Sequence, residues 1–106
     1  MFGTTFTIAD THLKHLRGQE SLKTFSQSRT VASGYKVTNH FCGTCGSLMY
    51  RVSEQYPGWS VLRLGTVDDF QLHETRLKPQ EEHFASNRVA WLKPVDGTKQ
   101  VIPGRL

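Results

Sequence analysis

The segment "NHFCGTCGSLMYR", residues 39–51, contains both cysteines of the chain and supplies the first structural prediction. Cys42 and Cys45 are separated by two residues, the spacing at which two sulfurs converge on one metal ion. Residues 35–41 alternate apolar and polar side chains, and residues 47–52 form a second β-rich run. We therefore predict a β-hairpin that carries a zinc knuckle at its tip.

The cysteine pair supplies only half of the ligands that a structural zinc ion requires, since such sites are nearly always four-coordinate. A site of two cysteines and two histidines is one interpretation, although no two histidines have zinc-finger spacing. A thioredoxin-like redox pair is a weaker one, because a helix should follow such a pair and a strand pattern follows here. Two free thiols on a turn are a third. The histidines available as ligands are His12, His15, His40, His73 and His83.

The remaining patterns favour a mostly β domain with little helix. β-branched and aromatic residues predict strands at residues 2–8 and 59–67, the second of them central, then a charged connection and a short strand at residues 82–84. Residues 9–25 fit either a short amphipathic helix or a turn followed by a strand. Turn residues dominate the C-terminal end, which we expect to lie across the surface. The length fits a single domain over residues 1–106.

Composition limits the classes of partner. The formal net charge is +4, but the basic residues are scattered and form no stripe, so we expect no nucleic-acid partner. No apolar run approaches the roughly 20 residues needed to cross a bilayer, so we expect no membrane partner. The closely spaced cysteines and the absence of a leader-like start lead us to expect a cytoplasmic protein.

Three segments together resemble the glutathione-dependent formaldehyde-activating enzyme family, which includes centromere protein V. They are F-C-x-x-C-G-S at residues 41–47, a strand ending in G-x-V-D-D at residues 65–69, and the pair Arg88 and Trp91. The ordered match runs over about residues 2–100 and resembles most the small fungal members. On this match the chain corresponds to the C-terminal two-thirds of the family's domain and is N-terminally shortened. We expect Trp91 in the core with Arg88 at its rim.

The resemblance implies an all-β fold of the β-tent type, bound zinc, and carbon–sulfur lyase chemistry on adducts such as S-hydroxymethylglutathione. In the family, an early C-x-C pair joins the late C-x-x-C in a structural zinc site, and a middle cluster holds a catalytic zinc. Only Cys42 and Cys45 match any of these positions. The resemblance therefore implies a Zn²⁺ half-site at these two residues, without the cluster for the catalytic ion.

Three explanations fit this pattern: a start at an internal methionine, a shortened paralogue with a new role, or a dimer in which two knuckles build one four-cysteine site. We expect a homodimer, because a shortened sheet leaves strand edges to be covered. Without the catalytic cluster, we expect that this chain alone does not process S-hydroxymethylglutathione.

The expected partner is a small molecule of the glutathione-adduct type. Arg51 and Arg63, which we place on neighbouring strands, are candidates to hold its carboxylate. One alternative is a metal-independent enzyme, for example in secondary metabolism, with His40, Arg63 and Asp69 as catalytic candidates. Asp69 is also interpreted more simply as a turn cap. Another alternative is a non-enzymatic binding module held together as a zinc-bridged dimer.

Overall fold

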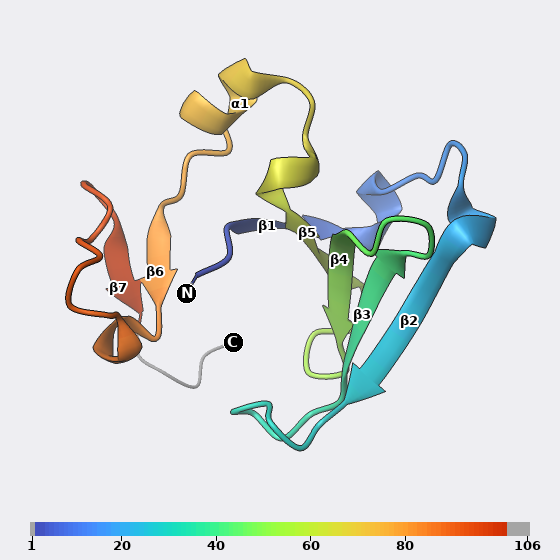
Figure 1. The fold of residues 1–106 in the computed structure, drawn as a ribbon, viewed down its shortest axis with the longest axis horizontal. Helices are drawn as coiled ribbons and strands as arrows, with labels where there is room; N and C mark the ends of the chain where they lie inside the picture. The colour runs from blue at the N-terminus through green and yellow to red at the C-terminus, as the bar shows by residue number, and fades with distance from the viewer. Residues whose placement is uncertain (1, 102–106) are drawn as a thin grey trace.

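The computed structural model describes residues 2–101 and is mostly β, which confirms the predicted fold class (Figure 1). One antiparallel sheet has five strands in the order β1-β5-β4-β3-β2, and a second sheet consists of β6 and β7 in parallel. The strands are β1 (Thr5–Ala9), β2 (Leu22–Gln27), β3 (Val37–Cys42), β4 (Leu48–Ser53), β5 (Trp59–Arg63), β6 (Glu81–His83) and β7 (Lys99–Val101).

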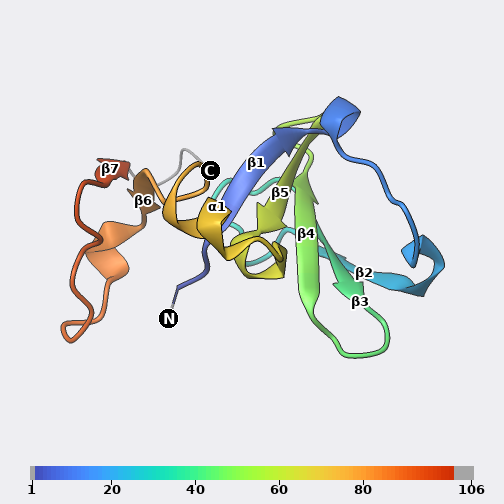
Figure 2. The same cartoon turned by 90° about the horizontal axis from the view of Figure 1, so that it is seen from above.

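The predicted hairpin is present. Strands β3 and β4 pair antiparallel, and the turn between them projects beyond one end of the sheet (Figure 2). The register shifts between His40 and Phe41, which marks a β-bulge just before the knuckle. Strand β5 lies in the interior of the sheet, in agreement with the prediction of a non-edge strand, because it pairs with β1 on one side and β4 on the other. It is shorter than expected, since a 3-10 turn at Leu64–Thr66 follows it.

Residues 9–25 form a turn and a strand, so the alternative of an amphipathic helix is wrong. Two short 3-10 turns, Asp10–His12 and Gln19–Ser21, precede β2. Gly18 has a φ of 77°, a left-handed conformation that glycine adopts without steric cost and that interrupts a helix. Leu16 is 83% exposed, so this segment has too little apolar contact to stabilise an isolated helix.

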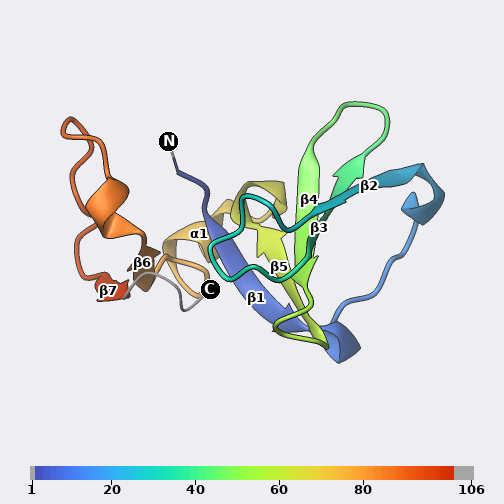
Figure 3. The same ribbon diagram turned by 90° about the horizontal axis from the view of Figure 1, so that it is seen from below.

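The connection between the two sheets carries a short helix, α1 (Phe70–Glu74), where the sequence suggested only a charged linker. Asp69 Oδ1 accepts a hydrogen bond of 3.0 Å from the backbone amide of Gln71, a standard N-cap contact. The interpretation of Asp69 as a cap is therefore confirmed. All three views place the small sheet apart from the large one, beyond α1 (Figure 1, Figure 2, Figure 3).

The C-terminal part of the described chain differs from two expectations. It does not simply lie across the surface, because β7 pairs with β6. Trp91 is 70% exposed, so its expected place in the core is wrong. Arg88 instead pairs with Glu82, which also accepts hydrogen bonds from the backbone amide of Val95 and the side chain of Gln100. Glu82 therefore organises the small sheet. None of the helices in residues 2–101 has the length and apolar character needed to span a membrane.

The large sheet is thinly covered. Among the described residues, Val37 and Leu64 are the only hydrophobic side chains that are buried. The chain exposes 8359 Å², whereas a compact protein of 12.0 kDa exposes about 6,000 Å². Its radius of gyration is 14.7 Å, against about 13 Å for a compact domain of this length. The chain therefore exposes much more surface than a compact domain of its mass.

Candidate functional site

Strand pairing sorts the side chains of the large sheet onto two faces, because directly paired residues of antiparallel strands point to the same side. We call one side the histidine face and the other the arginine face. A row across the histidine face contains Phe6, Leu62, Tyr50, His40 and Thr24. The neighbouring row, on the arginine face, contains Thr7, Val61, Arg51, Asn39 and Phe25. Arg63 follows Val61 by two residues and shares its face.

Cys42 and Cys45 lie at the tip of the β3–β4 hairpin, in a closed turn. Backbone hydrogen bonds of 2.8 Å run from Gly46 N to Cys42 O and from Cys42 N to Ser47 O. Gly46 has a φ of 79°, which disfavours any residue with a side chain. The backbone amides of Cys45 and then Thr44 donate toward Cys42 Sγ and lower the pKa of that thiol to about 7. The turn thus favours the thiolate, the form in which cysteine binds metals.

This knuckle fits a zinc ion as two ligands of four. Both cysteines are free thiols, and Cys45 Sγ lies 3.3 Å from Ser47 Oγ. Throughout residues 2–101, no three or more His, Cys, Asp or Glu side chains converge in a way that could hold a metal. A complete site of two cysteines and two histidines is therefore not formed within this part of the chain.

The histidine face carries a cluster of two imidazoles and a phenol. His40 stacks on Tyr50, with ring centroids 4.4 Å apart and ring planes at 12°. Tyr50 Oη lies 3.0 Å from His15 Nε2. Burial, and then the charge of His15, lower the pKa of His40. Burial, and then the charge of Asp10, raise the pKa of Tyr50. At neutral pH the cluster thus combines a neutral imidazole of His40 with a protonated phenol.

Arg51 and Arg63 share the arginine face, and within residues 2–101 neither forms an ion pair with a carboxylate. Arg51 and Arg63 lie on neighbouring strands, as predicted, and both are half-buried. Burial, and then the charge of Arg63, lower the pKa of Arg51. The ion pairs found in the described chain involve other residues: Lys36 with Glu54, His83 with Glu81, and Arg88 with Glu82. Asn39, opposite Arg51, has a buried Oδ1 that accepts no hydrogen bond.

The catalytic candidates His40, Arg63 and Asp69 do not form one cluster. His40 and Arg63 lie on opposite faces of the sheet, and the carboxylate of Asp69 caps α1. Sequence reasoning did not identify Tyr50 and His15 as partners of His40. The register of the hairpin would have revealed Tyr50, but the bulge after His40 makes that register hard to derive from spacing. Nothing in the sequence pattern indicates the contact with His15.

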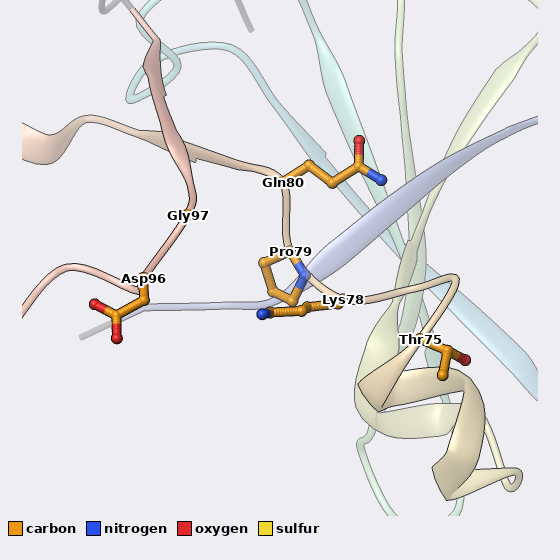
Figure 4. A pocket seen from close by; sticks show the side chains of 6 residues that line it. All are labelled: Thr75, Lys78, Pro79, Gln80, Asp96 and Gly97. Atoms are coloured by element: carbon orange, nitrogen blue, oxygen red, sulfur yellow. The ribbon is translucent and has the colours of Figure 1, made fainter.

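Two shallow hollows lie away from these residues. One, of about 210 Å³, is lined by the segment after α1 and the turn before β7, and includes Lys78 and Asp96 (Figure 4). The other, of about 290 Å³, lies beside the start of β5 and includes Asp10, Thr38 and Trp59. Neither is lined by the knuckle cysteines, the arginine pair or His40.

Comparison with known proteins gives one match. The model of the family described as glutathione-dependent formaldehyde-activating enzyme matches residues 1–87. Searches of curated proteins and of solved structures return no significant match. The matched region includes the large sheet, the knuckle at Cys42 and Cys45, both arginines of the pair, and α1. Because the match covers well over half of the sequence, the chain belongs to the glutathione-dependent formaldehyde-activating enzyme family.

Proposed function

We propose that this protein is a cytoplasmic, zinc-binding member of the carbon–sulfur lyase family that recognises a small molecule of the glutathione-adduct type. The preformed knuckle carries the zinc part of the proposal. Cys42 and Cys45 are free thiols at a projecting hairpin tip, and backbone amides favour the thiolate of Cys42. A reducing compartment preserves both thiols for metal binding.

The two missing ligands come, in this proposal, from the knuckle of a second copy. Structural zinc sites are tetrahedral, and four cysteines are one of the common ligand sets. The hairpin tip projects from the sheet, so that a second tip has access to it (Figure 3). The chain also exposes about 2,400 Å² more than a compact protein of its mass, and dimer formation would cover part of this surface. The proposed assembly is a zinc-bridged homodimer.

A zinc ion held by four cysteines has no open coordination position, so it stabilises structure without binding substrate. The described residues hold no second group of metal ligands. We therefore expect the isolated chain to bind a glutathione adduct without zinc-dependent turnover of S-hydroxymethylglutathione. Zinc-dependent release of formaldehyde by the purified 106-residue chain would contradict this part of the proposal.

Metal analysis combined with mass measurement in solution tests the zinc site. We expect one zinc per two chains, and loss of both zinc and dimer in Cys42→Ser and Cys45→Ser. His12→Ala removes an exposed histidine and is the matched control, because it should leave zinc content unchanged. A metal-free monomer would refute the zinc-bridged dimer, and loss of zinc in His12→Ala would show that a histidine completes the site.

A second candidate function is metal-independent acid–base catalysis, and the stacked pair His40 and Tyr50 favours it. A neutral imidazole can take the hydroxyl proton of a hemithioacetal while the carbonyl forms, the carbon–sulfur bond breaks and the thiolate leaves. Turnover that survives metal chelation and is lost in His40→Gln would support this function. Undiminished turnover in both His40→Gln and Tyr50→Phe would remove it.

A further inference from the structure

Arg51 and Arg63 are like charges on the same face of the large sheet, with Arg63 at the end of its strand. They come from the neighbouring strands β4 and β5, and neither is fully exposed. Bringing two guanidinium groups together on a half-buried surface is unfavourable unless an anion lies between or beside them. Within residues 2–101, no carboxylate pairs with either one. The missing anion is the first indication of a ligand.

Asn39 gives a second, independent indication. It lies directly opposite Arg51 in the β3–β4 pairing, and its Oδ1 is buried without a hydrogen-bond donor. An unsatisfied buried acceptor costs about 1–3 kcal/mol of stability, so buried polar groups in folded proteins nearly always have a hydrogen-bond partner. A guanidinium has five N–H donors and can turn one edge to an amide oxygen while another edge binds a carboxylate. Asn39 is therefore suited to position Arg51.

Gly3 leaves room for the guanidinium group of Arg63. An ideal Cβ on Gly3 would lie 1.9 Å from Nη1 of Arg63, so the guanidinium occupies space that only glycine leaves open. The contact involves the far end of a flexible side chain, so a methyl group at position 3 would displace the guanidinium and spare the backbone. Phe25, on the edge strand of the same face, is 61% exposed and offers apolar contact to the body of a ligand.

We propose that Arg51 and Arg63 form a carboxylate-binding site on the arginine face, with Asn39 and Gly3 positioning the two guanidinium groups. The ligand class is a small flexible molecule with one or two carboxylates and an apolar stem. Paired guanidinium groups suit carboxylates because each presents a planar fork of donors. The identification of this ligand with a glutathione adduct rests on the proposed function, whereas the carboxylate site itself does not.

Isothermal titration with glutathione, S-methylglutathione, succinate and inorganic phosphate tests the site. We expect Arg51→Gln and Arg63→Gln to weaken binding of the carboxylates about ten- to hundredfold, the worth of one charge-assisted hydrogen-bonded contact. Arg51→Lys keeps the charge but loses the fork and should bind weakly too. Arg29→Gln removes the same charge from an exposed loop and is the matched control, with affinity unchanged.

The outcomes separate this site from the proposed function. Equal binding of glutathione by the wild type and Arg51→Gln would overturn the site and leave glutathione recognition standing. Arginine-dependent binding of succinate without binding of glutathione would support the site and overturn glutathione recognition. Binding of none of the four probes, or preference for phosphate over the carboxylates, would overturn the site. Gly3→Ala guards against misfolding of the arginine variants, because it should weaken carboxylate binding while leaving the thermal unfolding temperature unchanged.

Discussion

If two chains share one zinc ion, as proposed, the thermal stability of this protein should depend on its concentration. If the folded species contains two chains and unfolding releases both, mass action favours the folded form as concentration rises. A monomer shows no such dependence. An interface that covered the excess area of about 2,400 Å² per chain would have the size of an obligate dimer interface. Such a dimer must show the concentration dependence.

The magnitude follows from chain length. Raising concentration a hundredfold, from 1 to 100 μM, stabilises the dimer by about 3 kcal/mol near 60 °C. Two chains of 106 residues unfold with an entropy of about 0.45 kcal/mol/K, at roughly 2.1 cal/mol/K per residue. The midpoint should therefore rise by about 7 °C over this range. Circular dichroism at the two concentrations, with path lengths scaled inversely, measures the shift directly.

Zinc supplies the control for this experiment. In Cys42→Ser, or after chelation, the bridge is lost, and the midpoint should fall and lose most of its concentration dependence. Sedimentation at 10 μM should then report a mass near 12.0 kDa, where the wild type gives twice that value. A wild-type midpoint that stays constant within 1 °C from 1 to 100 μM would refute the dimer and the inference drawn from exposed surface.

Three further predictions address individual residues. Leu64→Ala should lower the free energy of unfolding by about 2–5 kcal/mol, because Leu64 is only 6% exposed. Leu16→Ala, at an exposed position, should change it by less than about 0.5 kcal/mol. Equal effects of the two substitutions in denaturant titrations would contradict the assigned core. Gly43→Ala should weaken zinc binding, since its Cβ would lie 2.7 Å from the backbone oxygen of Ser21, while Gly65→Ala, with open space around it, should not; calorimetric zinc titration compares them. The amide of Val95, then Gln100 and Arg88, lower the pKa of Glu82, so its stabilising contribution is present above its ordinary pKa of 4.5 and is lost as pH falls through the lower folded value. Amide exchange in β6 and β7 should therefore accelerate in acid, and a pH response of the same size in Glu82→Gln would rule out this role.

The hairpin could be predicted because its signals are local. Alternating apolar residues on either side of Cys42 and Cys45 specify two strands, and the glycines of the knuckle specify the turn between them. The register of the two strands could not be predicted from the sequence, because the bulge between His40 and Phe41 changes which residues pair. A shift of one residue moves every following side chain to the other face, so the partners on each face require the structure.

The small sheet shows where local signals fail. Strand β7 is three residues long and pairs in parallel with β6, sixteen or more residues earlier in the chain, so its formation depends on a distant partner. Glu82 provides much of the connection through hydrogen bonds to Val95 and Gln100. No sequence pattern links Glu82 to Val95 or Gln100, so these hydrogen bonds could not be predicted from the sequence. Trp91 was misplaced for a related reason, since aromatic character predicts burial only where the fold provides a core to enter.

The arginine pair and the pair His40 and Tyr50 lie on opposite faces of the sheet, so substitutions can show which face binds the ligand. A ligand held by Arg51 and Arg63 occupies the arginine face, where His40 and Tyr50 cannot reach it through the sheet. Acid–base chemistry by His40 therefore requires a substrate bound on the histidine face, independent of both arginines. If substitution of either arginine abolishes ligand binding and His40→Gln does not, the ligand lies on the arginine face. The opposite pattern places it with the imidazoles, and metal-independent catalysis then becomes the better account of this family member.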